Sequence, residues 1–249
     1  MPAGEGRRVG LDDMKKTHFD FKQFTIYHDK CAMKVGTDGV LLGAWTVPQP
    51  GVKRILDVGT GSGLIAIMLA QKCGAALVGI DLDEAAVAQA RENAANTPWG
   101  DRLHFVQADA STFEPREPFQ LIVCNPPFFT ESLSCPDSRR DKARHCSALP
   151  FDVLLSRAAT WLEPEGLFKV VLPAVQADGF IQMAWERGLQ LHGKCWVCTK
   201  PGSRPKRVLL SFRKGAAPYP RTEWLAIRDQ EGRYTEAYMR LTEPYYLNF

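Results

Sequence analysis

Ile55-Leu-Asp-Val-Gly-Thr-Gly-Ser-Gly-Leu64 is the segment of this chain that says most about its fold. Apolar residues lead into Gly59, Gly61 and Gly63, and an apolar segment with helical spacing follows. This order predicts a buried strand that ends in a glycine loop and opens a helix. Glycines let the backbone approach a ligand closely, and the first N–H groups of a helix have no partner within it. We therefore expect an anionic or polar ligand at this loop.

Short apolar runs alternate with longer Ala- or Leu-rich segments along the chain around this loop. The runs predict strands over 54–58, 76–81, 103–107, 121–124 and 167–172, and the segments predict helices over 62–73, 84–97 and 151–162. Such alternation is typical of a parallel sheet with both faces covered. The fold class is therefore α/β, a doubly wound, mostly parallel sheet. An antiparallel C-terminal hairpin over 189–199 and 207–212 is expected at the sheet edge.

Composition excludes several classes of protein. The 249 residues are 45% hydrophobic and 24% charged, as in ordinary globular proteins. The longest apolar run, 64–70, is far shorter than the roughly 18 residues of a membrane span, and no apolar signal segment stands near residue 1. The seven cysteines lack framework spacing and are read as reduced thiols. We expect a cytoplasmic protein with no membrane association and no obligate protein partner.

One domain is expected over residues 1–249. In this interpretation 1–33 form an N-terminal extension, 34–214 the core, and 215–249 a tail packed on the core. No linker long enough to separate a second domain is present. Aromatic residues of the tail either stack on bases or pack onto the domain, and the sequence leaves both readings open: Tyr234, Tyr238, Tyr245, Tyr246 and Phe249.

Positive charge is concentrated in two stretches, 138–145 and 200–214. The whole chain has a net charge of only +3, so the rest of it is acidic. Clustered cations on an acidic body are typical of a surface that binds a phosphate backbone, and an ordinary solvated surface is the alternative. The candidate residues for contacts with a phosphate backbone are Arg139, Arg140, Lys142, Arg144, Arg204, Lys206 and Arg207.

Acidic residues stand at the ends of three successive predicted strands. Asp57 lies beside the glycine loop, where a carboxylate suits an ammonium group better than a pyrophosphate. Asp81 follows Gly63 at the usual distance for a carboxylate that binds ribose hydroxyls, and Asp109 is placed to read an adenine amino group. NAD is disfavoured because Leu64 stands where its fingerprint needs a third glycine. Each acid alone is more often a helix cap or turn residue, and their arrangement above one loop favours ligand binding.

Asn125-Pro126-Pro127-Phe128 is the most specific signal in the chain. The two prolines stop the preceding strand and hold Asn125 rigidly at the carboxyl edge of the sheet. An amide oxygen and the following carbonyl of Pro126 together can accept two hydrogens from one planar amine, and Phe128 can stack on the ring of that amine. A turn whose Asn caps a helix is the less favoured alternative.

These motifs together resemble the class I S-adenosylmethionine-dependent methyltransferases, in the branch that methylates exocyclic or amide nitrogens. The branch usually carries Asn-Pro-Pro-Tyr, and Phe128 keeps the ring without the phenol hydroxyl. The resemblance implies a Rossmann-like methyltransferase fold and S-adenosyl-L-methionine as the cofactor. Implied cofactor-binding residues are Thr37, Asp57, Gly59, Gly61, Gly63, Asp81, Asp109 and Asn125; implied catalytic residues are Asn125, Pro126, Pro127 and Phe128.

Further segments are similar to the bacterial tRNA (adenine-N6)-methyltransferases that modify valine tRNA beside its anticodon. They are 34–45 (KVGTDGVLLGAW), Phe128-Phe129, 200–205 (KPGSRP) and 232–238 (GRYTEAY). The resemblance implies methylation of adenine N6 in RNA, with tRNA as the partner. The alternatives are guanine N2 of ribosomal RNA, a protein glutamine, or a non-catalytic RNA-binding module. No metal is expected, because Cys195 and Cys198 have no second ligand pair and fit a strand better than a zinc site.

Overall fold

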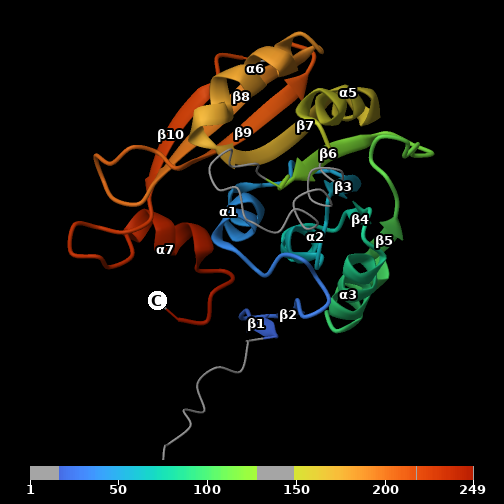
Figure 1. The fold of residues 1–249 in the computed structure, drawn as a ribbon, viewed down its shortest axis with the longest axis horizontal. Helices are drawn as coiled ribbons and strands as arrows, with labels where there is room; N and C mark the ends of the chain where they lie inside the picture. Colours follow the sequence, from blue (N-terminus) through green and yellow to red (C-terminus); the bar gives the residue numbers. More distant parts are fainter. Residues whose placement is uncertain (1–16, 128–148, 217, 249) are drawn as a thin grey trace, which may run out of the picture.

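An eight-stranded sheet is the centre of the computed structural model, which describes residues 17–127, 149–216 and 218–248 (Figure 1). From one edge to the other its strands are β10 (Arg221–Ala226), β8 (Leu189–Cys198), β9 (Arg207–Lys214), β7 (Leu162–Pro173), β6 (Phe119–Cys124), β3 (Arg54–Val58), β4 (Ala76–Asp81) and β5 (Leu103–Gln107). Strands β7, β6, β3, β4 and β5 are parallel, and β9 is antiparallel to both β7 and β8. The predicted fold class is confirmed.

The C-terminal hairpin differs in one respect from the expectation. Strands β8 and β9 are antiparallel as predicted, but they do not form the edge of the sheet. The unpredicted strand β10 pairs with β8 in parallel and takes that place. Its residues Arg221–Glu223 are exposed and polar, so they carry none of the apolar pattern by which a buried strand is recognised.

Helices cover both faces of the sheet (Figure 1). On one face lie α1 (Thr37–Trp45), α2 (Leu64–Ala70), α3 (Glu84–Ala95) and α7 (Glu236–Thr242), and on the other lie α5 (Phe151–Trp161) and α6 (Ala177–Trp185). Each face has its own hydrophobic core, because successive strand residues such as Ile55 and Leu56 point to opposite sides. Helix α1 shows no amphipathic period in the sequence, since all of its residues 39–44 are buried.

Segments from both ends of the chain pack together on the α1 face. Strand β1 (His18–Asp20) pairs with β2 (Thr25–Tyr27), and Phe21 forms a bridge with Tyr246. Tyr238 and Tyr245 are buried in the core, and the Tyr245 hydroxyl donates to the Met68 carbonyl at 3.2 Å. These two tail residues therefore pack onto the domain, which was one of the two interpretations. Phe249 lies outside the described residues.

Cys195 and Cys198 are buried residues of β8. Their spacing of three along a strand directs their side chains to opposite faces of the sheet. Among the described residues, no group of three or more His, Cys, Asp or Glu side chains could hold a metal ion. The prediction that both cysteines belong to a strand is confirmed. No helix in the described part of the chain is long and apolar enough to cross a membrane.

Lys72 closes the C-terminus of α1 from the turn after α2. Its Nζ donates to the carbonyls of Gly43, Ala44 and Thr46 at 2.8, 2.5 and 2.7 Å. The last carbonyls of a helix have no partner within it, so one ammonium satisfies groups that burial would otherwise leave bare. Burial lowers the pKa of Lys72 to about 8. This contact matters for the site, because the other end of α1 packs there.

Replacing Lys72 by methionine is expected to lower the free energy of unfolding by roughly 1.5 to 3 kcal/mol, the range for hydrogen bonds to a charged group. Methionine keeps much of the apolar stem and removes the three donors. Urea unfolding at pH 7 measures the change, and Lys53→Met, at an exposed lysine before β3, is the matched control. Equal stabilities of the two variants would contradict this role for Lys72.

Candidate active site

The carboxyl ends of β3, β4, β5 and β6 meet at one edge of the sheet. Val58, at the end of β3, pairs with Ile80 of β4 on one side and with Cys124 of β6 on the other. The glycine loop and Asn125 therefore leave neighbouring strands at the same level. The N–H groups of Gly59 and Thr60 donate to the Ile80 carbonyl at 2.9 and 3.0 Å, which ties the loop to β4.

The three loop glycines divide into two kinds. All have positive φ, +68° at Gly59, +54° at Gly61 and +81° at Gly63. A Cβ added to Gly59 or Gly61 would meet nothing within 4 Å, whereas one on Gly63 would lie 3.1 Å from the Phe105 ring and 3.2 Å from Ala90. Gly59 and Gly61 therefore border open space that a ligand can enter. Gly63 instead allows α2 to pack closely on α3 and β5.

Asp81, at the end of β4, is joined to the glycine loop. Its Oδ2 accepts from the Gly61 N–H at 2.8 Å, and its Oδ1 accepts from the Asp83 N–H at 3.0 Å. The side chain is only partly buried, and Gly61, to which it is hydrogen-bonded, borders open space. The sequence predicted a ligand-binding carboxylate here, and the structure adds that it also holds the loop.

Asp57 is buried beneath the loop, with 1% of its surface exposed. Its Oδ2 accepts from the Thr60 hydroxyl at 2.7 Å and from the Ala66 N–H at 3.3 Å. Within the described residues its Oδ1 is buried without a hydrogen-bond partner. Burial raises the pKa of Asp57 to about 7, against the opposing hydrogen bonds from Thr60 and Ala66. The carboxylate braces the loop with one oxygen and leaves the other for a donor.

Asp57 makes the stability of the protein depend on pH. With a raised pKa, the folded state holds a proton between pH 4 and 7 that the unfolded state has lost, so stability falls as pH rises through this window. Relative to Asp57→Asn, the free energy of unfolding of the ligand-free protein is expected to decrease by up to about 1.4 kcal/mol per pH unit. Urea unfolding of both proteins at pH 4.5, 5.5 and 6.5 measures the difference. A difference independent of pH would contradict the assignment.

Asp109 follows β5 and lies exposed at the same edge. Its Oδ1 accepts from the Ser111 N–H at 2.7 Å, and its carbonyl accepts from the Phe113 N–H at 2.8 Å. The hydrogen bonds from Ser111 to the carboxylate lower the pKa of Asp109. The side chain thus caps a turn, as the structural alternative to ligand binding predicted. Its position at the end of β5 is the predicted one.

Asn125 comes directly after β6, followed by the buried Pro126 and the exposed Pro127. Its Oδ1 is buried and has no hydrogen-bond partner among the residues that the structure describes. A Cβ added to Gly39 of α1 would lie 3.8 Å from Asn125 Nδ2, so the first turn of α1 packs against this amide. Thr37 is the exposed first residue of that turn. An unsatisfied buried carbonyl oxygen is costly unless a ligand supplies a donor.

The predicted RNA-binding residues divide between described and undescribed parts of the chain. Arg204 and Lys206 are exposed in the loop between β8 and β9. Arg207 is partly buried, and its Nε donates to Asp38 Oδ2 at 2.8 Å, which joins β9 to the first turn of α1. The other predicted RNA-binding residues lie outside the described residues: Arg139, Arg140, Lys142 and Arg144. The predicted catalytic residue Phe128 also lies outside them.

Two residues of α3 that the sequence reading missed connect the site to the N-terminal segment. Asn93 Nδ2 donates to the carbonyls of Ser62 and Tyr27, each at 2.8 Å. Gln89 Oε1 accepts from the Lys30 N–H at 3.3 Å. Both amides are buried on the face of α3 that otherwise carries alanine and valine. Two amides four residues apart on an apolar helix face are the signal that could have revealed them.

The N-terminal segment also approaches Asp81. The pKa of Cys31 is raised to about 11, mainly by burial and also by the negative charges of Asp81 and Asp83. Residues before α1, which were predicted to be an extension of the core, therefore lie beside the candidate site.

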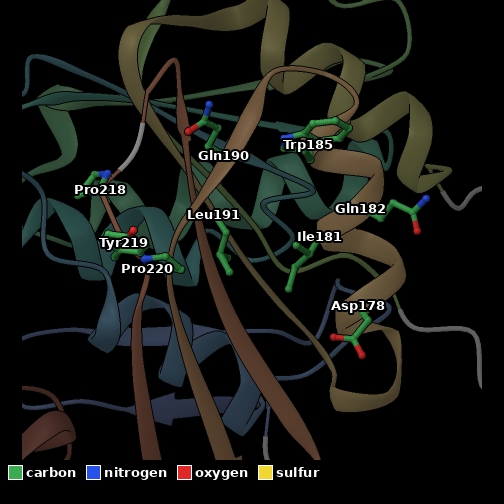
Figure 2. Close-up of a pocket in the computed structure, with 9 residues that line it drawn as sticks. All are labelled: Asp178, Ile181, Gln182, Trp185, Gln190, Leu191, Pro218, Tyr219 and Pro220. Atoms are coloured by element: carbon green, nitrogen blue, oxygen red, sulfur yellow. The ribbon is translucent and has the colours of Figure 1, made fainter.

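A cavity of about 740 Å³ lies away from this edge (Figure 2). It is lined by α6, by the first residues of β8 and by 218–220 before β10, and Trp185 and Tyr219 stand on opposite sides of it. Those parts of β8 and β10 belong to the amino edge of the sheet, opposite the glycine loop. The cavity contains none of the predicted site residues.

Comparison with known proteins agrees with this arrangement. Residues 55–166 match a family model described as a methyltransferase domain. The fold is similar to that of a predicted O-methyltransferase from Agrobacterium tumefaciens, with a TM-score of 0.64, 19% identity, and coverage of 84% of this chain and 96% of that one. It is also similar to a glycopeptide N-methyltransferase solved with S-adenosylmethionine, with a TM-score of 0.54, 15% identity, and coverage of 74% and 89%. Fold and glycine loop define a methyltransferase of the S-adenosylmethionine-dependent class.

Curated relatives narrow the class. A tRNA1(Val) (adenine(37)-N6)-methyltransferase from Phocaeicola vulgatus is 48% identical over 94% of this chain and 100% of its own length. One of the same name from Klebsiella pneumoniae is 44% identical over 94% of this chain and 96% of its own length. The chain belongs to the family of the tRNA1(Val) (adenine(37)-N6)-methyltransferases.

Proposed function

We propose that this protein transfers a methyl group from S-adenosyl-L-methionine to N6 of adenine 37 in tRNA1(Val). The observation that carries the proposal is Asn125, whose buried Oδ1 has no hydrogen-bond partner within the described residues, beside the open glycine loop. An amine donor brought to this edge would satisfy that oxygen. The names of the curated relatives support the choice of substrate.

Residues of the glycine loop and its acids fit the cofactor. Gly59 and Gly61 leave the space that a bound ligand needs, and Asp57 Oδ1 can accept from an ammonium group. Asp81 would hold the ribose and Asp109 the adenine, and Thr37 would contact the cofactor from the first turn of α1. When bound, S-adenosylmethionine supplies the methyl group in activated form, as a sulfonium. Gly63 contributes by packing rather than by contact.

Asn125 and Pro126 would prepare the acceptor nitrogen. The lone pair of adenine N6 is delocalised into the ring, so the amine is a poor nucleophile. The Asn125 Oδ1 and the Pro126 carbonyl would accept its two hydrogens and pull them out of the ring plane, which takes the lone pair out of conjugation. They would also stabilise the positive charge that develops on nitrogen. Gly39 and the prolines hold the amide in place, which favours alignment of nitrogen, methyl carbon and sulfur. In this proposal Pro127 maintains the bend and Phe128 stacks on the adenine.

Basic residues on the same edge would hold the RNA. Arg204 and Lys206 are exposed there, and 139–144 follow Asn125 closely in the chain. Arg207 has a different role in this proposal, because its ion pair with Asp38 supports α1. The target base must leave its stack to reach the pocket, which is easier in an RNA loop than in a duplex. We propose that the protein is a single domain and acts in the cytoplasm.

Incubation with labelled S-adenosylmethionine and separate pools of tRNA, ribosomal RNA and protein tests the proposal. Nucleoside mass spectrometry of the tRNA is expected to find N6-methyladenosine, and mass spectrometry of nuclease fragments is expected to place it at position 37 of tRNA1(Val). Label in ribosomal N2-methylguanosine or in a protein glutamine would instead support an alternative acceptor. No label in any pool, with intact cofactor binding, would indicate a module without catalysis.

A further inference from the structure

Two loops extend the functional edge of the sheet beyond the acceptor site. Strands β8 and β10 run parallel to β7, so the loops after them, 199–206 and 227–235, leave the sheet at the same edge as Asn125. Three and four strand spacings separate β8 and β10 from β6, a distance of about 15 to 20 Å. The loops lie side by side at the left of Figure 1, in orange and red.

Hydrogen bonds join these loops into one surface, which we call the two-loop surface. The Arg228 N–H donates to the Thr199 carbonyl at 2.9 Å, so strand-like pairing continues beyond β8 and β10. Lys200 Nζ donates to the Gln230 carbonyl at 2.9 Å, and Gln230 Nε2 donates to the Pro201 carbonyl at 3.3 Å. The two loops therefore present their side chains in a shared arrangement.

Arg228 is held in place by two contacts within its own loop. Its Nη1 donates to the Gly232 carbonyl at 2.6 Å, and its guanidinium lies 4.3 Å from the centre of the Tyr234 ring. Tyr234 in turn stacks on the buried Tyr238, with ring centres 5.1 Å apart and planes at 20°. Arg228 is nevertheless exposed. A guanidinium held flat and facing solvent is prepared to bind a phosphate, because little side-chain entropy is lost on contact.

The charge of the two-loop surface is positive. Lys200, Arg204, Lys206 and Arg228 form no ion pair with a carboxylate of the described residues. The acids of the second loop, Asp229 and Glu231, both pair with Arg233. The two loops together carry five basic and two acidic residues, a net charge of +3. This spacing of single cations suits the repeated charges of a nucleic-acid backbone.

We propose that the two-loop surface binds backbone phosphates of the RNA substrate, and that Arg228, supported by Tyr234, is a positioning residue for it. The surface holds the RNA while the target base enters the pocket beside Asn125. This inference rests on the proposed function and adds the loop 227–235 to it. Tyr234 belongs to the segment 232–238, one of those that are similar to the tRNA methyltransferases, and this segment leads from the loop into α7.

Three variants test the inference: Arg228→Ala, Arg228→Lys and the double variant Arg204→Ala/Lys206→Ala. The control is Arg240→Ala, an exposed arginine of α7 outside the two loops. We expect Arg228→Ala to raise KM for tRNA roughly three- to tenfold, with kcat and the Kd of S-adenosylmethionine unchanged. Each lost phosphate contact is expected to reduce the slope of log K against log salt by about 0.7 to 0.9. Arg228→Lys keeps the charge, so its salt slope should equal that of the wild type. Its KM should lie between those of the wild type and Arg228→Ala, because lysine lacks the planar guanidinium.

The results of these experiments distinguish RNA binding by the two-loop surface from a purely structural role of Arg228. They also show whether this inference or the proposed function is the one that fails. If Arg228 only clasps its own loop, Arg228→Ala will lower the unfolding midpoint in urea and leave the salt slope unchanged, which overturns its role in binding. Arg204 and Lys206 protrude without side-chain hydrogen bonds to the described residues, so their double variant should fold normally. An unchanged KM and slope in that variant and in Arg228→Ala would overturn the surface as a whole. If wild-type protein methylates no tRNA, it is the proposed function that fails.

Discussion

Asn125→Ala is expected to lower the turnover of methyl transfer about a hundredfold or more and to leave the Kd of S-adenosylmethionine nearly unchanged. The loss of one preorganised acceptor at a developing charge has this magnitude in other enzymes. Asn125 Oδ1 is buried and has no partner within the described residues, so its removal breaks no hydrogen bond of the folded chain. A selective effect on catalysis follows.

Single-turnover methylation of tRNA measures the rate, and calorimetry measures cofactor binding. Asn96→Ala is the matched control, because Asn96 is an exposed residue at the C-terminus of α3. Urea unfolding should show Asn125→Ala to be at least as stable as the wild type, since the variant removes a buried oxygen that has no hydrogen-bond partner within the described residues. Near wild-type turnover would refute the role of Asn125. An equal loss of cofactor binding would mean that Asn125 serves the cofactor rather than the acceptor amine.

Asp81→Ala is expected to weaken binding of S-adenosylmethionine by roughly 1.5 to 3 kcal/mol, or about ten- to 150-fold in Kd. The variant loses a charged acceptor for the ribose hydroxyls. It also loses the acceptor of the Gly61 N–H at 2.8 Å, so the glycine loop becomes less ordered. Both effects act in the same direction.

Calorimetric titration of the cofactor measures this effect, with Asp101→Ala, at an exposed aspartate of the turn before β5, as the control. Asp81→Asn separates the two contributions: it keeps a neutral acceptor for Gly61 and loses the charge. An affinity between those of the wild type and Asp81→Ala is expected. Unchanged affinity in Asp81→Ala, or binding of NAD as strong as that of S-adenosylmethionine, would contradict the cofactor assignment.

Strands β3, β4 and β5 were predicted residue for residue because each is a short apolar run bounded by polar or glycine residues. Helix α2 was predicted to span 62–73 and is shorter, Leu64–Ala70, because Gly63 at φ +81° begins it and the chain turns after Ala70. Helix α1 could not be recognised by periodicity, since burial on all sides removes the polar face that a pattern needs. Strand β10 is exposed, and only its pairing with β8 defines it.

Site residues were predictable where a local motif constrains the backbone. Gly59, Gly61 and Asn125 are such cases, because positive φ and a double proline restrict the chain whatever its surroundings. The roles of Gly63 and Arg207 depend on residues far away in the chain. Gly63 packs against Ala90 and Phe105, and Arg207 pairs with an aspartate 169 positions before it. No local pattern reports such contacts.

Local patterns in the chain were enough to predict the parallel strands and their connecting helices, the glycine loop and the proline-bounded asparagine, since hydrophobic periodicity and backbone sterics act over a few residues. Which side chains share a site depends on tertiary contacts. The tertiary structure placed α1 against Asn125, divided the glycines between ligand space and packing, and brought the loops after β8 and β10 to the edge that holds the acceptor. The physical reason is that strand pairing across the sheet is non-local: β9 lies between β7 and β8, and this insertion makes β8 and β10 parallel to β7 and directs their carboxyl ends toward the site.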